Sequence, residues 1–232
     1  MTAGSGFAEQ DLSTPKRAWG QRLPGIRQRL QSSANVLALT FDACGGGYDR
    51  QLMDMLLHNH VAATLFISGR WIDRHPREFA WLAQQPLFSI GNHGLEHKPC
   101  SVTGRGAYGI RGTGSVDELQ KEVQGNAKKI EQLSGCKPTL FRAGTAYYDA
   151  QAVDFIQKMG YTPVGFNVNG DGGASYSAKQ IKKQLLTAKP GSIILLHMNR
   201  PQGFTAEGLL LALPELKQRG MTFVTLDVKG LH

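Results

Sequence analysis

Short apolar runs recur along the chain from residue 36 onward, and segments with helical periodicity separate them. Each run is rich in β-branched and aliphatic residues without alternating polar positions, which is typical of parallel strands buried on both faces. The predicted strands are residues 36–41, 63–67, 88–91, 139–142, 162–166, 192–197 and 222–226.

The segments between these runs place apolar residues on one helical face. The clearest helix is predicted after Ser115, which has capping-box spacing with Glu118 and precedes a periodic series that ends at Gly135. Asp49 is the predicted N-cap of an earlier helix. Further helices are predicted over residues 150–159, 178–188 and 206–219, and the glycine-rich residues 103–114 form a predicted surface loop.

Alternation of strand and helix predicts an α/β fold with parallel strands. The count favours a deformed (β/α) barrel of about seven parallel strands, and a doubly wound sheet stays open as an alternative. No glycine-rich nucleotide motif follows the first strand. Residues 1–34 lack sustained periodicity and are predicted to be an arm or leader, so the domain is expected to span residues 35–232.

The composition is that of an ordinary globular protein, with 232 residues, 41% hydrophobic and 19% charged. A net charge of +8 favours anionic partners, but the positive charges are spread, so no nucleic-acid partner is predicted. No apolar run is long enough for a membrane span. The first residues lack the charged-then-apolar order of a secretory signal, which predicts a cytoplasmic protein or an exported one whose signal has been removed.

Polar residues follow the predicted strands at the points where these strands end. In a parallel barrel these ends open onto one face, where active sites are built. We therefore expect one site that contains Asp42, His93, Arg142, Asp171 and His197.

His93 and His97 are four positions apart, a spacing that can aim both imidazoles at one point if the segment turns helically. Imidazole nitrogens suit zinc, cobalt, nickel or iron. Glu96 lies directly before the second histidine, so the segment is not the HExxH motif of a metalloprotease. The pair predicts a divalent metal site.

Five segments in order resemble the motifs of the NodB-type polysaccharide deacetylases, carbohydrate esterase family 4. These segments are LALTFDACGG with Asp42, HGLEH at residues 93–97, FRAGTAYYD at residues 141–149, NGDGGA around Asp171, and IILLH ending at His197. The resemblance implies a deformed barrel of about seven strands. It also implies metal-assisted hydrolysis of N-acetyl or O-acetyl groups on a sugar polymer.

By the same resemblance, Asp42 is the general base that deprotonates the attacking water and His197 is the general acid for the leaving group. A carboxylate can accept that proton, and a histidine that titrates near neutral pH can donate one. Arg142 matches the residue that orients the base, and Asp171 matches a supporting position in the fourth motif.

The resemblance also assigns residues to the substrate. A backbone N–H near Thr145 is expected to contact the acyl oxygen, and Leu195 is expected to line the pocket for the acetyl methyl group. Residues 143–145 depart from the Pro-Pro-Tyr-like segment of the family's third motif, and Tyr147 and Tyr148 could instead supply an aromatic surface for sugar stacking.

The chain departs from the family at Ala43, where the second of two adjacent aspartates usually binds the metal. His93 and His97 alone would be a weak zinc site, because catalytic zinc normally has three protein ligands. Asp42, Asp49 or Cys44 could supply the third, or the site could be empty. We rank Asp42 first and an empty site second, with zinc as the expected metal and cobalt or nickel as alternatives.

Three functional hypotheses follow. The leading one is a deacetylase acting on peptidoglycan, a chitin-like oligomer or an exopolysaccharide, in the periplasm or secreted. The alternatives are a non-catalytic carbohydrate-binding relative that has lost its metal, and an amidase or esterase for a small acylated molecule. Cys44 and Cys100 each follow a motif, so they either form a disulfide or stay as thiols, and Cys136 is assigned to packing.

Overall fold

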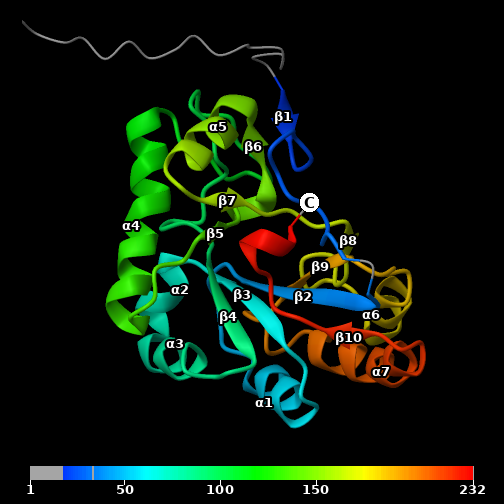
Figure 1. Ribbon diagram of the computed structural model, residues 1–232. Helices are drawn as coiled ribbons and strands as arrows, with labels where there is room; N and C mark the ends of the chain where they lie inside the picture. The colour runs from blue at the N-terminus through cyan, green and yellow to red at the C-terminus, as the bar shows by residue number, and fades with distance from the viewer. Residues whose placement is uncertain (1–17, 33, 232) are drawn as a thin grey trace, which may run out of the picture.

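Parallel strands form the centre of the protein, and helices cover the outside of the sheet (Figure 1). The computed structural model describes residues 18–32 and 34–231. All strand pairs of the main sheet are parallel. In spatial order the strands are β7 (Thr162–Pro163), β5 (Leu140–Phe141), β4 (Phe88–Asn92), β3 (Ala63–Ile67), β2 (Val36–Ala43), β9 (Ile193–His197) and β8 (Val168–Asn169).

This path of seven parallel strands curls into a half-barrel, and β10 (Thr222–Phe223) pairs with the start of β2 as an eighth strand. The predicted deformed barrel is confirmed. The predicted strands at residues 162–166 and 222–226 form only at their first two residues, and β8 was not predicted. The segment before β2 contacts both halves of the sheet, because Arg27 bridges to Val164 just after the edge strand β7 and Arg29 bridges to Ser192 just before β9.

Most of the helices begin where a polar side chain caps the first turn. Asp49 accepts a hydrogen bond from the Leu52 N–H at 2.9 Å, and Ser115 accepts one from Glu118 at 3.2 Å, as the sequence predicted. The helices are α1 (Arg50–His58), α2 (Gly69–Arg74), α3 (Pro76–Leu82), α4 (Val116–Ser134), α5 (Ala150–Lys158), α6 (Ala178–Leu185) and α7 (Thr205–Gln218), with short 3-10 turns at Gly144–Ala146 and Val228–Gly230. Within the described chain, α3 and α7 begin without such a side-chain cap.

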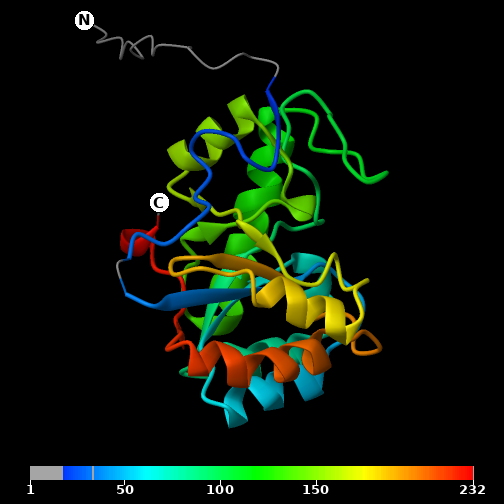
Figure 2. The same cartoon turned by 90° about the vertical axis from the view of Figure 1, so that its right-hand side faces the viewer.

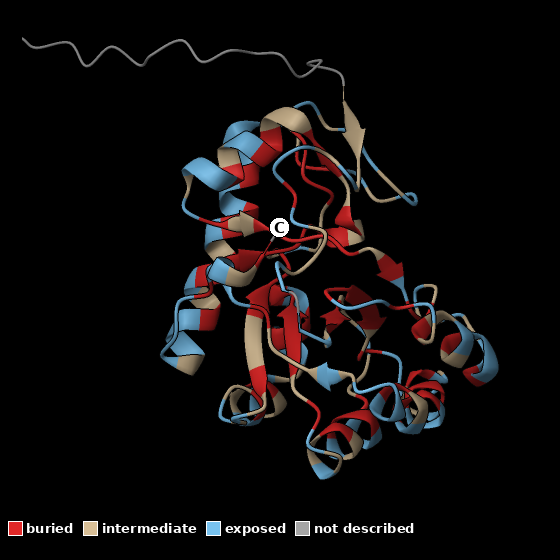
Figure 3. Cartoon of the chain, turned by 45° about the vertical axis from the view of Figure 1, so that its right-hand side comes forward, coloured by how far each residue is buried: buried red, intermediate tan, exposed pale blue. Residues whose placement is uncertain are grey.

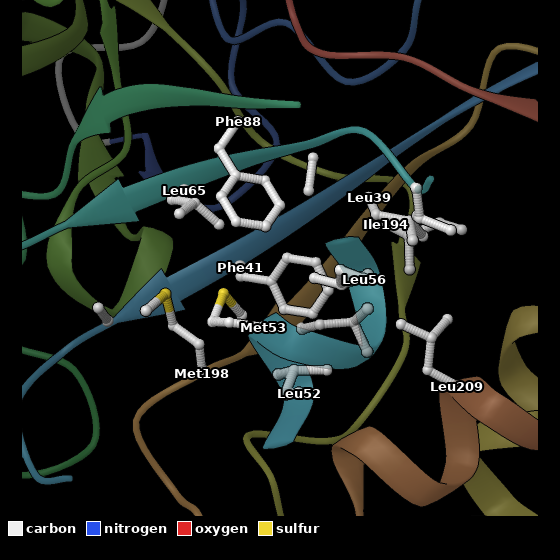
Figure 4. Close-up of a cluster of buried hydrophobic side chains, with 14 of the residues drawn as sticks. Leu39, Phe41, Leu52, Met53, Leu56, Leu65, Phe88, Ile194, Met198 and Leu209 are labelled. Carbon is white, nitrogen blue, oxygen red and sulfur yellow. The ribbon is translucent and has the colours of Figure 1, made fainter. Parts of the chain in front are cut away.

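The largest hydrophobic cluster lies between the sheet and the helices that cover β2, β3 and β9 (Figure 4). Side chains alternate between the two faces of a strand. Phe41 and Ala43 therefore join this cluster, together with Leu52 of α1. A second cluster fills the inside of the half-barrel and includes Phe66 and Leu195. The alternation leaves Asp42, between Phe41 and Ala43, on the inner side (Figure 3 shows the buried interior in red).

The described part of the predicted arm lies along the domain (Figure 2). Within it, β1 (Trp19–Gly20) pairs with β6 (Tyr148–Asp149), which belongs to the predicted third motif. Residues 1–17 and residue 33 of the predicted arm lie outside the described residues, and the boundary at residue 34 stays a prediction. No helix within residues 18–32 and 34–231 is long and apolar enough to cross a bilayer.

Candidate functional site

A cavity of about 580 Å³ opens at the carboxyl ends of the parallel strands, the face on which the sequence predicts the site. Residues from distant parts of the chain line it, among them Asp42, Cys44, His97, Thr145, Leu195 and His197. His93 and Arg142 lie directly behind this lining and are fully buried.

Asp42 and Arg142 form a buried ion pair. The Arg142 Nη1 donates to the Asp42 Oδ1 at 2.7 Å and to the Thr40 hydroxyl at 3.0 Å, while its Nη2 donates to the Gly165 carbonyl. The guanidinium also lies 4.1 Å from the centre of the Phe66 ring. Burial acts to raise the pKa of Asp42, but the charge of Arg142 outweighs it with the help of nearby histidines, so the carboxyl pKa falls below its usual value.

His93 is oriented by the backbone of the neighbouring strand. Its Nδ1 lies 2.9 Å from the Arg142 carbonyl oxygen, which can only accept, so Nδ1 carries the proton. In the neutral ring Nε2 then carries no proton, so its lone pair is available to a metal ion, and it lies 3.5 Å from the Asp42 Oδ2. Burial opposes protonation of His93, but the Asp42 carboxylate raises the pKa of this imidazole above its usual value.

The HGLEH segment is a loop around a buried carboxylate and not a helical turn. Glu122 of α4 accepts hydrogen bonds from the backbone N–H groups of Glu96 and Lys98 at 2.9 to 3.1 Å. Gly94 adopts a φ of 80°, and a Cβ there would collide with the Glu122 carboxylate. The loop brings the rings of the two motif histidines to a centroid distance of 4.8 Å.

His97 presents an unpartnered nitrogen to the cavity. Its Nε2 is buried and has no hydrogen-bond partner among the described residues. Such orphaned polar atoms are rare in folded proteins and call for an explanation such as a bound ion.

Cys44 lies beside both histidines. Its Sγ is 3.6 Å from the His93 Nε2, and the donor atoms of Cys44, His93 and His97 all lie within 4.8 Å of one another. Burial acts to raise the pKa of this thiol, but the adjacent imidazoles, His97 first, lower it well below its usual value. The prediction that ranks Asp42 first as the third ligand stays a prediction.

His197 is paired with Asp171. Its Nδ1 lies 2.9 Å from the Asp171 Oδ1, and its backbone N–H donates to Oδ2 at 2.7 Å. The Thr205 hydroxyl donates to the same Oδ2. Burial acts to lower the pKa of His197, but the hydrogen bond and charge of Asp171, together with those of Cys44, outweigh it and raise this pKa well above the usual value.

The substrate residues proposed from the sequence lie at different places around the cavity. Thr145 has a φ of 69° and lines the cavity, and its buried hydroxyl has no partner within the described chain. Leu195 lines the cavity floor from β9. Tyr147 lies outside the lining, between the rings of Trp19 and Tyr108, each 5.6 Å away. Tyr148 is fully buried, where its hydroxyl accepts from the Ala143 N–H, so it offers no surface to a sugar.

Cys44 and Cys100 do not form a disulfide, which was one of the two possibilities left open by the sequence. All three cysteines lie in the described part of the chain and are free, with Cys100 buried and Cys136 exposed. The prediction that Cys136 is a packing residue is therefore wrong, because its side chain is exposed.

Three contributors to the site were missed or undervalued from the sequence. Cys44 is the first residue after β2 and lines the cavity with Asp42 two positions earlier, so the alternation of side chains along the strand, continued by one residue, is the signal for its inward direction. Glu122 left a weaker trace in the sequence, because it is an acidic residue among the apolar positions that form the buried face of α4. Tyr108 is contributed by the long loop, and no local pattern marks it.

Comparisons with known proteins agree with this geometry. Residues 29–164 match the family model described as "Polysaccharide deacetylase". This range contains Asp42, His93, His97 and Arg142, whereas Asp171 and His197 follow it.

Named relatives and solved structures extend the similarity over most of the chain. A peptidoglycan-N-acetylglucosamine deacetylase of Bacillus cereus is 28% identical over 210 residues, which are 87% of this chain and 91% of the relative. A peptidoglycan-N-acetylmuramic acid deacetylase of Bacillus subtilis is 26% identical over 201 residues, 83% of this chain and 70% of the relative. The fold matches that of a carbohydrate esterase family 4 pseudoenzyme from Bacillus anthracis with a TM-score of 0.73 at 21% identity, over 86% of this chain and 66% of that one.

Proposed function

Since the chain belongs to the polysaccharide deacetylase family, we propose that it is a metal-dependent hydrolase that removes acetyl groups from an amino-sugar polymer or oligosaccharide. The observation that carries this proposal is the convergence of Asp42, His93, His97 and His197 at one cavity. Peptidoglycan and chitin-like chains are the substrates we favour, because similar proteins are named for such activities.

The residues of the site fit a divalent cation. The unpartnered Nε2 of His97 and the correctly protonated ring of His93 are suited to hold it. Zinc is the ion we propose, and cobalt and nickel are the alternatives, because imidazole nitrogens suit all three. A cation bound there supplies Lewis-acid polarisation of the acyl carbonyl.

Asp42 is the proposed general base. The ion pair with Arg142 keeps this carboxylate ionised at neutral pH and fixes its direction toward the cavity. In our proposal, Asp42 takes a proton from the attacking water as the water oxygen bonds to the acyl carbon.

His197 is the proposed general acid. Its raised pKa keeps the imidazole protonated near neutral pH, and Asp171 holds Nδ1 so that Nε2 faces the cavity. When the bond between the acyl carbon and the sugar nitrogen breaks, Nε2 gives its proton to the leaving amine. The products are acetate and a free amino sugar. The proton taken by Asp42 and the proton of the new acetic acid pass to solvent, and His197 regains its proton from solvent before the next turnover.

Thr145, Leu195 and Tyr147 are proposed to position the acetylated sugar. Thr145 offers polar groups for the acyl oxygen, and Leu195 offers an apolar surface for the methyl group. Tyr147 supports Tyr108, whose exposed ring is suited to pack on a pyranose face.

We further propose that the protein works outside the cytoplasm, in the periplasm or as a secreted protein. Peptidoglycan-like polymers lie there, and a net charge of +8 favours association with anionic cell envelopes. Immunodetection in periplasmic and culture fractions tests this part of the proposal, and recovery in the cytoplasmic fraction alone would contradict it.

The first experiment combines metal analysis with activity. We expect the purified protein, loaded with zinc, to hold about one ion per chain and to release acetate from N-acetylglucosamine oligomers or peptidoglycan. The double variant His93→Ala/His97→Ala should lose both properties, while Cys136→Ser, at an exposed remote position, should keep them.

A protein that binds oligosaccharide but holds no zinc, cobalt or nickel would contradict the hydrolase. The non-catalytic carbohydrate-binding alternative would then stand. Release of acetate from small acylated molecules but not from polymers would favour the amidase or esterase alternative.

A further inference from the structure

The end of β2 directs alternate residues to opposite sides of the sheet. Ala43 is buried in the cluster that contains Phe41 and Leu52, on the side that the helices cover. Asp42 and Cys44 both line the cavity on the other side. A donor that compensates for the alanine at position 43 is therefore available at the next inward position.

The sulfur of Cys44 stands at a ligand-like distance from the histidines. In a tetrahedral zinc site, a zinc–sulfur bond of about 2.3 Å and a zinc–nitrogen bond of about 2.0 to 2.1 Å separate sulfur from nitrogen by roughly 3.5 Å. The Sγ of Cys44 lies 3.6 Å from the His93 Nε2, and the His97 donor lies within 4.8 Å of both.

Asp42 is less suited to complete this set. Its Oδ1 is held by Arg142 at 2.7 Å. In the described residues, the group of possible metal ligands whose ligand atoms all lie within 4.8 Å of one another consists of Cys44, His93 and His97, and it does not include Asp42. A carboxylate bound to an arginine and also to a metal would lose basicity, whereas a separate ligand leaves Asp42 free to accept a proton.

We propose that Cys44 is the third protein ligand of the divalent cation, as a thiolate beside His93 and His97. The inference rests on the proposed function, because it completes the metal site of that hydrolase. Binding forms a sulfur–metal bond and releases the thiol proton to solvent. A site with one sulfur and two nitrogens favours zinc and cobalt over magnesium, calcium or manganese.

Cobalt substitution of the full chain gives a readout that does not depend on activity. Visible d–d bands report that Co²⁺ is bound, and a near-ultraviolet charge-transfer band reports a bond from sulfur. We expect both in the wild type and in Cys136→Ser, which keeps the site intact. Cys44→Ser should lose the charge-transfer band and bind zinc at least about 100-fold more weakly, since loss of a residue that only supports a ligand already costs about 10- to 100-fold.

Cys44→Asp separates the identity of the donor from damage to the fold. This variant replaces sulfur with a carboxylate, so we expect it to retain bound cobalt without the charge-transfer band. Wild-type protein with d–d bands but no charge-transfer band, or a band that persists in Cys44→Ser, would overturn the role of Cys44 and leave the proposed hydrolase standing. Failure of the wild type to bind any cobalt or zinc would overturn both.

Discussion

Asp42 of β2 and His197 of β9 are register neighbours on adjacent parallel strands. Neighbours in register project their side chains to the same face, so both groups enter the cavity side by side. Their partners act in opposite directions, because Arg142 lowers the pKa of Asp42 while Asp171 raises that of His197. One pair of strands therefore presents an ionised carboxylate beside a protonated imidazole, the combination that base and acid catalysis needs.

Replacing Asp42 with asparagine removes the base and keeps its shape. We expect the rate of acetate release to fall by about 10²- to 10⁴-fold, the usual contribution of general acid–base catalysis. Zinc content should stay near one ion per chain if Cys44 is the third ligand. Thermal melting must accompany the assay, because Arg142 would lose its buried counter-charge, at a cost of up to about 3 to 5 kcal/mol. Turnover at the wild-type rate would remove Asp42 as the base.

Replacing Asp171 with asparagine should change the pH profile as well as the rate. His197 must be protonated to act as an acid, so activity is lost as the pH rises through its raised pKa. Without the carboxylate that pKa falls, and the alkaline limb of kcat/KM should move to lower pH.

The same change has an expected effect on stability. A histidine whose folded-state pKa is raised stabilises the fold below its unfolded pKa, about 6.5, and loses that contribution as pH rises through the folded value. The melting temperatures of wild type and Asp171→Asn should therefore differ most at acidic pH. An unchanged alkaline limb, in protein that melts like wild type, would show that Asp171 does not tune His197.

Replacing Glu122 with glutamine should loosen the loop that carries both histidines. The amide keeps one oxygen but loses an acceptor for the Glu96 and Lys98 N–H groups. We expect zinc affinity to fall by about 10- to 100-fold, as measured by competition with a chromogenic chelator. Glu131→Gln, at an exposed position of the same helix, is the matched control. If Glu122→Gln binds zinc as tightly as Glu131→Gln, Glu122 does not position the histidines for the metal.

Much of the fold was predictable because it depends on local patterns. Buried parallel strands appear as continuous apolar runs, and caps such as Asp49 and Ser115 mark where helices start. The two-residue strands β7, β8 and β10 were harder to predict. Their pairing is determined by the edges of the curled sheet, which is a property of the whole domain.

The site was predictable wherever a residue lies at the carboxyl end of a strand. Asp42 is the last residue but one of β2, Arg142 directly follows β5 and His197 ends β9, and the barrel brings these ends together. The support of the HGLEH loop was not predictable, because Glu122 contacts it from a distant helix. The prediction that Tyr148 contacts a sugar is wrong, because its ring is fully buried beside Phe141 and its hydroxyl accepts a hydrogen bond from the Ala143 N–H.

Replacing Tyr108 with alanine tests whether the long loop takes part in binding the polymer. The ring is 75% exposed and packs edge-on against Tyr147 at the border of the cavity. Loss of an aromatic contact worth about 0.5 to 1.5 kcal/mol should raise KM for N-acetyl oligosaccharides by roughly 2- to 10-fold, with little change in kcat. Tyr108→Phe should restore KM, and Leu210→Ala, an exposed apolar position on α7, should leave it unchanged. An unaltered KM for Tyr108→Ala across short and long oligomers would exclude the loop from substrate binding.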